Sequence, residues 1–325
     1  MPYDVVCLRP EADFRRVNAL PPPSFTITYR APDDAELAAL VGEARALVIP
    51  AVGPRLPAEL FERSTVRLVQ VTGAGVDRLD EPALKRLGIP VCNVPGGSNR
   101  AVAEYAAACA STLLRRLAWA SAEVRAGRYE PFRKRMLADN LAGIEALKVG
   151  IVGLGVIGLA VAEAFHALGA RIAYYDPAPR DPLAAAALGA QSLALEALLA
   201  TSDVVTLHVP LLPATEGLIG ERELAAMKPG AILINASRGG VVDEKALAAS
   251  LDSGRLGGAA VDVYSTEPPA PDNPLLQLSG EAAAKLILTP HIAGVNRQSF
   301  AHLFKAAWQN VERVLRGETP VNRVY

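Results

Sequence analysis

The sequence predicts an α/β protein made of two doubly wound domains, each built on a parallel sheet. Three observations support this class. Short apolar runs alternate with helical patterns along the chain, which indicates parallel strands with helices on both faces of a sheet. One apolar run leads into a glycine-rich turn and then an apolar helix. The 325 residues are enough for two substantial cores.

Composition narrows the class of protein. The 33 Lys and Arg residues nearly balance the 34 Asp and Glu residues, which disfavours nucleic acid or an anionic membrane as the main partner. Cys7, Cys92 and Cys109 are widely spaced, so we expect no metal site, no disulfide framework and a cytoplasmic location. Early charged residues and the lack of an 18-residue apolar window lead us to expect neither signal peptide nor membrane span.

The first part of the chain predicts one of the two sheets. Apolar runs typical of strands cover residues 5–8, 25–29, 46–49, 66–71 and 91–94, with helical patterns over 33–41, 57–63 and 81–87. A glycine-rich turn, Thr72–Asp77, follows the fourth run. Its backbone amides could hold an anion, or the turn could be only a tight connection, and its residues favour neither interpretation.

A domain boundary is expected at Pro95–Asn99, where residues that punctuate secondary structure gather. A long alanine-rich helix is predicted from Ala101 to about Arg125. The following residues, to Asn140, are polar and strongly basic, especially from Arg125 to Arg135. We interpret this segment as a solvated surface or a contact with a partner subunit, in preference to a substrate-facing surface.

A nucleotide-binding pattern follows. The apolar run Val149–Val152 predicts a buried parallel strand. After it, Gly153 permits a tight turn, Gly155 lets a pyrophosphate approach the backbone, and Gly158 lets the next helix, 159–168, pack closely. The phosphates are expected at the positive end of that helix.

The next strand, 171–175, ends at Asp176, whose carboxylate is suited to accept hydrogen bonds from ribose hydroxyls. The order of strand, glycines, helix, strand and acid predicts a nicotinamide dinucleotide site. Asp176 would repel the 2′-phosphate of NADP, so NAD is favoured. Arg180, four residues on, could partner that phosphate and keeps NADP open as the less favoured cofactor.

The remaining strands are predicted at 203–209, 231–235, 258–263 and 286–289, with helices at 193–200, 221–227, 243–253 and 298–316. In a doubly wound fold, ligands bind at the carboxyl ends of the strands. The polar residues expected there are His208, Ser237, Arg238, Asp262, Glu267 and His291.

Hydride transfer between a nicotinamide and a carbonyl needs a substrate clamp and a proton donor. Arg238 suits the clamp, because a guanidinium offers paired donors. His291 suits the proton donor, since an imidazole titrates near neutrality, and Glu267 could orient it. Taken singly, each residue has an ordinary structural interpretation: a solvated arginine, a satisfied loop histidine, and a glutamate capping a turn.

Taken together, the motifs resemble the D-isomer-specific 2-hydroxyacid dehydrogenase family. The resemblance covers nearly the whole chain and rests on TGAGVDRLD, VAEYA, VGIVGLGVIG, NASRGGVVDEKAL, GGAAVDVYSTEPP, LTPHIAG and VLRGETPVN. It implies hydride transfer between nicotinamide and C2 of a small 2-oxo or 2-hydroxy acid. It also implies that Arg238, Glu267 and His291 form the catalytic set.

The resemblance further implies that backbone amides of Ala74 and Gly75 bind the substrate carboxylate. Asp262 would hold the nicotinamide carboxamide. Side-chain selectivity would depend on the loop 50–53 and on Asn99–Arg100. The implied contacts with NAD are Gly153, Gly155, Val156, Ile157, Gly158, Asp176, His208, Val209, Pro210, Thr215, Ala236 and Asp262.

The resemblance also sets the expected architecture. Two Rossmann- or flavodoxin-like domains would enclose a cleft, with residues 1–97 and 291–325 as the substrate domain and 98–290 as the NAD domain. The helix from Ala101 would contribute to a homodimer. The chain ends soon after its last helix, so we expect no extra regulatory domain of the kind found in many phosphoglycerate dehydrogenases, which argues against that substrate.

Other functions on the same scaffold stay open. One is an NAD-sensing interaction protein similar to the C-terminal-binding-protein corepressors, although no added interaction tail is evident. The others are relatives of formate or phosphite dehydrogenases, towards which no feature of the sequence points.

Overall fold

The computed structural model describes residues 3–325 and divides the chain into two compact units. Unit 1 comprises the residues up to Ser98 together with Val295–Tyr325, and unit 2 comprises Asn99–Gly294. Each unit contains one parallel sheet with helices on both faces, which confirms the predicted fold class.

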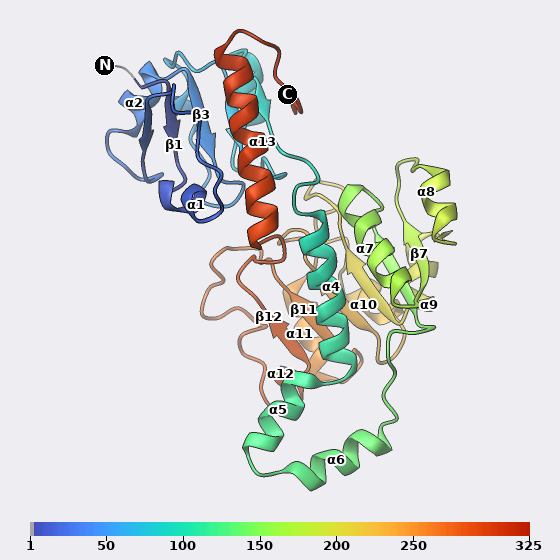
Figure 1. Cartoon of the computed structure of the whole chain (residues 1–325). Coiled ribbons are helices and arrows are strands. Elements are labelled where there is room, and N and C mark those ends of the chain that lie inside the picture. The colour runs from blue at the N-terminus through green and yellow to red at the C-terminus, as the bar shows by residue number, and fades with distance from the viewer. Residues whose placement is uncertain (1–2) are drawn as a thin grey trace. The chain divides into compact units, whose positions relative to one another are not determined.

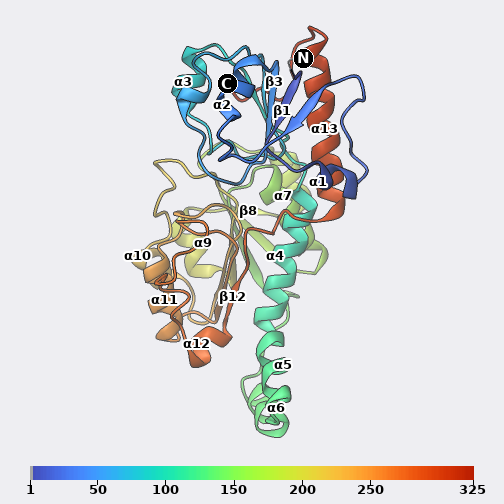
Figure 2. The same cartoon turned by 90° about the vertical axis from the view of Figure 1, so that its left-hand side faces the viewer.

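Unit 1 has a five-stranded parallel sheet of order β2-β1-β3-β4-β5, the flavodoxin-like arrangement. Helices α1 and α13 cover one face, where the rings of Phe14, Phe304 and Trp308 pack together, and Figures 1 and 2 show α13 running along the sheet. Helices α2 and α3 cover the other face. The elements of unit 1 are β1 (Val5–Cys7), α1 (Glu11–Arg16), β2 (Ile27–Tyr29), α2 (Leu37–Glu43), β3 (Ala46–Ile49), η1 (Ala58–Leu60), β4 (Val69–Val71), α3 (Glu81–Arg86), β5 (Val91–Cys92) and α13 (Arg297–Leu315).

Unit 2 has a seven-stranded parallel sheet of order β12-β11-β10-β9-β6-β7-β8. In chain order this is the doubly wound dinucleotide-binding arrangement extended by one strand, with its switch point between β6 and β9. Helices α4, α7 and α8 pack on one face, and α9, α10 and α11 on the other. The elements are α4 (Asn99–Leu114), β6 (Lys148–Val152), α7 (Val156–Ala167), β7 (Arg171–Tyr175), α8 (Pro182–Ala187), β8 (Gln191–Ser192), α9 (Leu195–Thr201), β9 (Val204–Leu207), α10 (Glu221–Ala226), β10 (Ile232–Asn235), α11 (Glu244–Asp252), β11 (Gly258–Val261), α12 (Gly280–Ala284) and β12 (Leu286–Leu288).

The prediction of a single helix from Ala101 to Arg125 is wrong. The helix breaks at Arg116, whose φ of 51° is left-handed, into α4 and α5 (Leu117–Arg125). The following basic segment forms a further helix, α6 (Tyr129–Ala138), and Figure 1 shows α5 and α6 extending away from the sheet of unit 2. Arginines of this segment have acidic partners, because Arg128 pairs with Glu123 and Arg135 with Glu281.

Two smaller differences concern element length and domain boundaries. The helix predicted at 57–63 is only the short η1, because the amides of Leu60 and Phe61 bond to carbonyls three residues back and not four back as in an α-helix. Residues 291–294, assigned above to the substrate domain, belong to unit 2. They stay there because Asp262 of unit 2 accepts hydrogen bonds from the amides of His291, Ile292 and Ala293.

Within residues 3–325, no helix is both long and apolar enough to cross a membrane. In the same described part of the chain, His, Cys, Asp and Glu side chains do not gather into a group that could bind a metal ion.

Candidate active site

The glycine-rich turn between β6 and α7 is shaped by close backbone contacts. Gly153 has a φ of +91°, a conformation that glycine adopts readily. A Cβ at Gly158 would lie 1.9 Å from the Gly153 carbonyl oxygen, so only glycine fits there. Gly155 is the N-cap residue immediately before α7, and a Cβ there would meet nothing within 4 Å. The first and third glycines therefore close the turn, while the second leaves open space where phosphates can reach the helix N-terminus.

Asp176, at the end of β7, is already fully engaged. Its carboxylate accepts hydrogen bonds from the amides of Leu154 (2.8 Å) and Ala178 (2.9 Å) and from two guanidinium nitrogens of Arg180 (2.6 and 2.9 Å). Burial acts to raise the pKa of Asp176, but Arg180 and the amides outweigh it and hold the pKa below its ordinary value. A carboxylate offers about four lone-pair sites, so a ribose hydroxyl can bind only if a donor leaves. The Arg180 side chain, a third exposed, is the donor most able to move.

The loop after β9 carries further predicted cofactor contacts. The Nε2 atom of His208 contacts the Thr206 hydroxyl at 2.8 Å, whereas its buried Nδ1 atom has no hydrogen-bond partner in the described chain. Burial lowers the pKa of His208 to about 3, so the ring is neutral and offers a hydrogen bond without charge. The Thr215 hydroxyl donates to the Pro210 carbonyl at 2.6 Å and so closes the loop. Val209 is buried beside Gly153, and Ala236 follows β10.

The histidine and glutamate predicted for proton transfer are in direct contact. His291 Nδ1 lies 2.8 Å from Glu267 Oε2, and Glu267 Oε1 accepts the Tyr264 amide at 3.1 Å. Burial acts to raise the pKa of Glu267, but the bonds from His291 and Tyr264 and the charge of Arg238 keep the pKa below its usual range. Both side chains are about one quarter exposed, at 25% for His291 and 28% for Glu267, so a ligand can reach them.

Arg238 follows β10 on a tightly organised turn. The Asn235 side chain accepts from the Ser237 hydroxyl at 2.8 Å and donates to the Arg238 carbonyl at 3.2 Å. A Cβ at Gly239 would lie 1.8 Å from the Tyr264 carbonyl oxygen. Because Gly239 has no Cβ, the turn that carries Arg238 packs closely against the backbone of Tyr264, three residues before Glu267. The three residues of the predicted catalytic set all belong to unit 2.

The predicted carboxylate-binding residues Ala74 and Gly75 belong to unit 1, in the turn after β4. The Asn93 side chain donates to the Ala74 carbonyl at 2.7 Å and fixes that turn.

Arg78 is a residue that the sequence analysis missed. It is 4% exposed and donates to the carbonyls of Pro50 (2.9 Å), Val52 (3.4 Å) and Pro54 (2.8 Å). A Cβ at Gly53 would come within 3.0 Å of its guanidinium carbon. Arg78 thus fixes the main-chain path of the loop 50–54 through three hydrogen bonds. The sequence did not predict this role, because Arg78 binds main-chain carbonyl oxygens, which every residue has.

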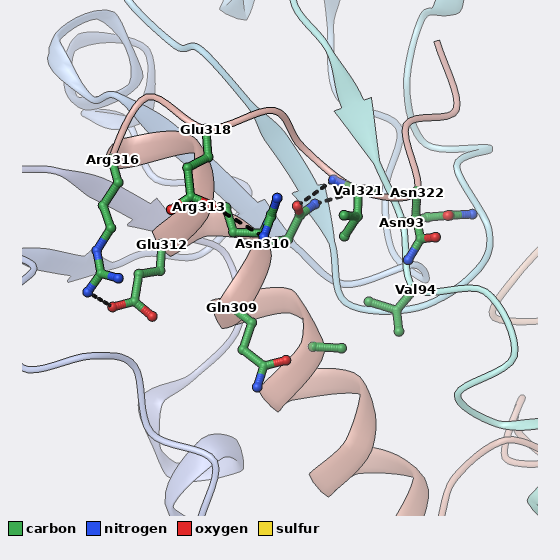
Figure 3. A pocket seen from close by; sticks show the side chains of 11 residues that line it. Asn93, Val94, Gln309, Asn310, Glu312, Arg313, Arg316, Glu318, Val321 and Asn322 are labelled. Carbon is green, nitrogen blue, oxygen red and sulfur yellow. Dashed lines mark hydrogen bonds and ion pairs between the residues drawn. The ribbon is translucent and has the colours of Figure 1, made fainter.

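A hollow of about 450 Å³ lies in unit 1 along the C-terminal end of α13. Figure 3 shows Glu312 paired with Arg316 on its wall, and Arg313 pairs with Glu318. Its charges are thus neutralised, and its lining includes none of the predicted site residues. We assign it no ligand.

Comparison with known proteins shows the family to which the chain belongs. Residues 107–293 match the family model described as the NAD binding domain of D-isomer specific 2-hydroxyacid dehydrogenases. The chain is 37% identical over 270 residues to glyoxylate reductase of Korarchaeum cryptofilum, covering 83% of this chain and 79% of the relative. It is 36% identical over 264 residues to D-3-phosphoglycerate dehydrogenase of Archaeoglobus fulgidus, covering 81% of this chain and 48% of that relative.

Among solved structures, the TT0316 protein of Thermus thermophilus superposes with a TM-score of 0.84 at 32% identity, covering 99% of both chains. The fold and the glycine turn define a dinucleotide-binding protein. More specifically, the chain belongs to the D-isomer specific 2-hydroxyacid dehydrogenase family, and unit 2 contains its NAD-binding domain. The chain spans about half the length of the Archaeoglobus phosphoglycerate dehydrogenase.

The contact between Arg180 and Asp176 predicts an effect on cofactor choice. Arg180→Ala frees the carboxylate for ribose hydroxyls and removes a cation that can pair with a 2′-phosphate. We expect the KM for NADPH to rise by about tenfold, while the KM for NADH stays constant or falls. Parallel steady-state assays with the two cofactors measure this, with the exposed, ion-paired Arg222→Ala as control. Equal changes for both cofactors would contradict it.

Proposed function

We propose that this protein is an NAD(H)-dependent D-2-hydroxyacid dehydrogenase that reduces a small 2-oxo acid. The observation that carries the proposal is the 2.8 Å contact between His291 and Glu267, with Arg238 close enough to influence the pKa of Glu267. These groups stand on the unit that contains the NAD-binding domain. An acid, its orienting carboxylate and a guanidinium together meet the needs of carbonyl reduction.

NADH, when bound, supplies the hydride that adds to C2 of the substrate. His291 in its protonated form donates a proton to the oxygen that becomes the hydroxyl. Glu267 holds the Nδ1 side of the ring, which leaves Nε2 to face the substrate. Arg238 binds the carboxylate and the carbonyl oxygen with its paired donors. The backbone amides of Ala74 and Gly75, in the turn after β4, are proposed as further donors to a carboxylate.

The substrate class proposed is a 2-oxo acid with a short side chain, such as glyoxylate or hydroxypyruvate. A relative that is 37% identical is named glyoxylate reductase. In addition, Arg78 donates hydrogen bonds to main-chain carbonyls of the loop 50–54, which keep the loop in one conformation. We propose that this loop and, separately, Asn99–Arg100 affect selectivity for the substrate side chain.

We also propose a cytoplasmic homodimer in which α5 and α6 contact the partner. Four large apolar side chains on these helices are more than half exposed: Leu117, Val124, Tyr129 and Leu137. Burying such a surface against a second chain is favourable. A sedimentation mass equal to one chain would contradict the dimer.

The experiment that tests the proposed function is spectrophotometric. Purified protein is mixed with NADH or NADPH and with glyoxylate, hydroxypyruvate, pyruvate or phenylpyruvate, and absorbance at the nicotinamide band is followed. We expect NADH oxidation with at least one short 2-oxo acid. NADH binding without turnover on any of them would favour a sensing role instead.

Removing the imidazole tests the acid. We expect His291→Ala to lower kcat for reduction by roughly 10²- to 10⁴-fold, while the Kd for NADH changes little, because the ring is proposed to act on the substrate. Fluorescence titration and steady-state kinetics give the two quantities. His166→Ala, at an exposed position on α7, serves as control, and an equal loss of binding and turnover would count against the role.

Glu267→Gln tests the carboxylate. The pKa of Glu267 is held low, so the side chain is ionised throughout the neutral range and stabilises the imidazolium. Without that charge, the pH above which reduction declines should move down by about one unit. A pH profile of kcat measures the shift. Glu281→Gln, which alters an ion-paired glutamate of α12, should leave the profile unchanged, and an unshifted Glu267→Gln profile would disprove the coupling.

A further inference from the structure

His291 lies in a turn whose backbone needs external support. Its φ is +55°, a left-handed conformation that non-glycine residues seldom adopt unless their surroundings impose it. It also belongs to a short irregular stretch between β12 and α13. The position of its ring over a substrate therefore depends on what holds this stretch in place.

Asp262, which directly follows β11, holds the turn at the strained residue and at the two residues after it. Its main-chain carbonyl accepts the His291 amide at 2.8 Å. Its carboxylate accepts the amides of Ile292 and Ala293, each at 2.8 Å, through its two different oxygens. Asp262 is 1% exposed, so water does not compete for these bonds.

Two hydroxyl groups orient that buried carboxylate in turn. The Thr289 hydroxyl donates to Asp262 Oδ1 at 2.5 Å, and Tyr105 Oη lies 2.7 Å from the same Thr289 oxygen. Because the single hydroxyl hydrogen of Thr289 points to the carboxylate, Tyr105 must be the donor in the outer bond. Burial raises the pKa of Tyr105, which keeps its phenol protonated for that purpose. Tyr105 lies on α4, in the VAEYA motif to which no function has been assigned above.

We propose that Thr289 and Tyr105 are positioning residues that act through Asp262 to hold His291 in its working orientation. This inference rests on the proposed function, since it assumes that His291 transfers the proton. The carboxylate accepts one bond at Oδ2 and two at Oδ1, which leaves one of its roughly four lone-pair sites. A nicotinamide carboxamide can use that site, so one buried group would set both the histidine turn and the nicotinamide ring.

Two substitutions of similar volume separate this role from simple packing. Thr289→Val keeps the shape and removes the hydroxyl, whereas Thr289→Ser keeps the hydroxyl. We expect Thr289→Val to lower kcat by roughly ten- to a hundredfold and to raise the isotope effect with NADH deuterated at the transferred position. Thr289→Ser should recover most of the rate. Tyr105→Phe, which removes only the outer donor, should lower kcat less than Thr289→Val does.

A measurement without cofactor or substrate tests the geometry directly. The chain contains 4 histidines, and the NMR signals of their ¹³C-labelled rings can be assigned by comparison with His291→Ala. We expect the His291 signal to shift or broaden in Thr289→Val and to stay in place in Thr289→Ser, with thermal unfolding checked for every variant.

The outcomes are distinguishable. An unmoved His291 signal in folded Thr289→Val, or equal losses of rate in the Val and Ser variants, would overturn the positioning role. A moved signal in a protein that reduces none of the 2-oxo acids would support the geometry and reject the proposed function. If Thr289→Val does not fold, an unmoved His291 signal and a wild-type rate in Tyr105→Phe would overturn the inference.

Discussion

The sheet of unit 2 is buried on both faces, and this constraint determines where chemistry can occur. The residues of β9, β10 and β11 are all buried, and helices cover the two faces. Polar side chains are therefore concentrated where the strands end, because loop amides and hydroxyls can form hydrogen bonds with them there. At these ends the chain places the glycine turn and Asp176, then His208, Arg238 and the Asp262–Glu267 segment. The candidate site is a consequence of how this sheet is covered.

Strand positions could be predicted from the sequence because a buried parallel strand is a short apolar run, and every predicted strand is present. Features that depend on the backbone conformation of a single residue could not be predicted from the sequence. The alanine-rich pattern continues smoothly through Arg116, where one left-handed residue divides the helix. The edge strand β8 is two exposed residues long, Gln191–Ser192, and carries no apolar signal at all.

The same distinction applies to the site. Arg238, Glu267 and His291 could be selected because the expected strand ends and the family motifs point to them. The pairing of Asp176 with Arg180 was also accessible, since the two residues are four apart. By contrast, Tyr105 and Thr289 are separated by 184 positions, and Arg78 binds only main-chain carbonyls. Neither contact leaves a spacing that one sequence reveals, because each depends on packing between distant segments.

The clamp made by Arg78 has a consequence for how this scaffold can diverge. A guanidinium that binds carbonyl oxygens is indifferent to the side chains of the residues it holds. Val52, which is exposed, is therefore free to vary while the path of the loop is preserved. Ala51 packs against the core of unit 1, and Gly53 is fixed by the guanidinium against it. New selectivities can thus evolve by point substitution on an unchanged frame, and because Arg78 lies outside the loop, a segment of the same length from a homologue can be held by the same arginine.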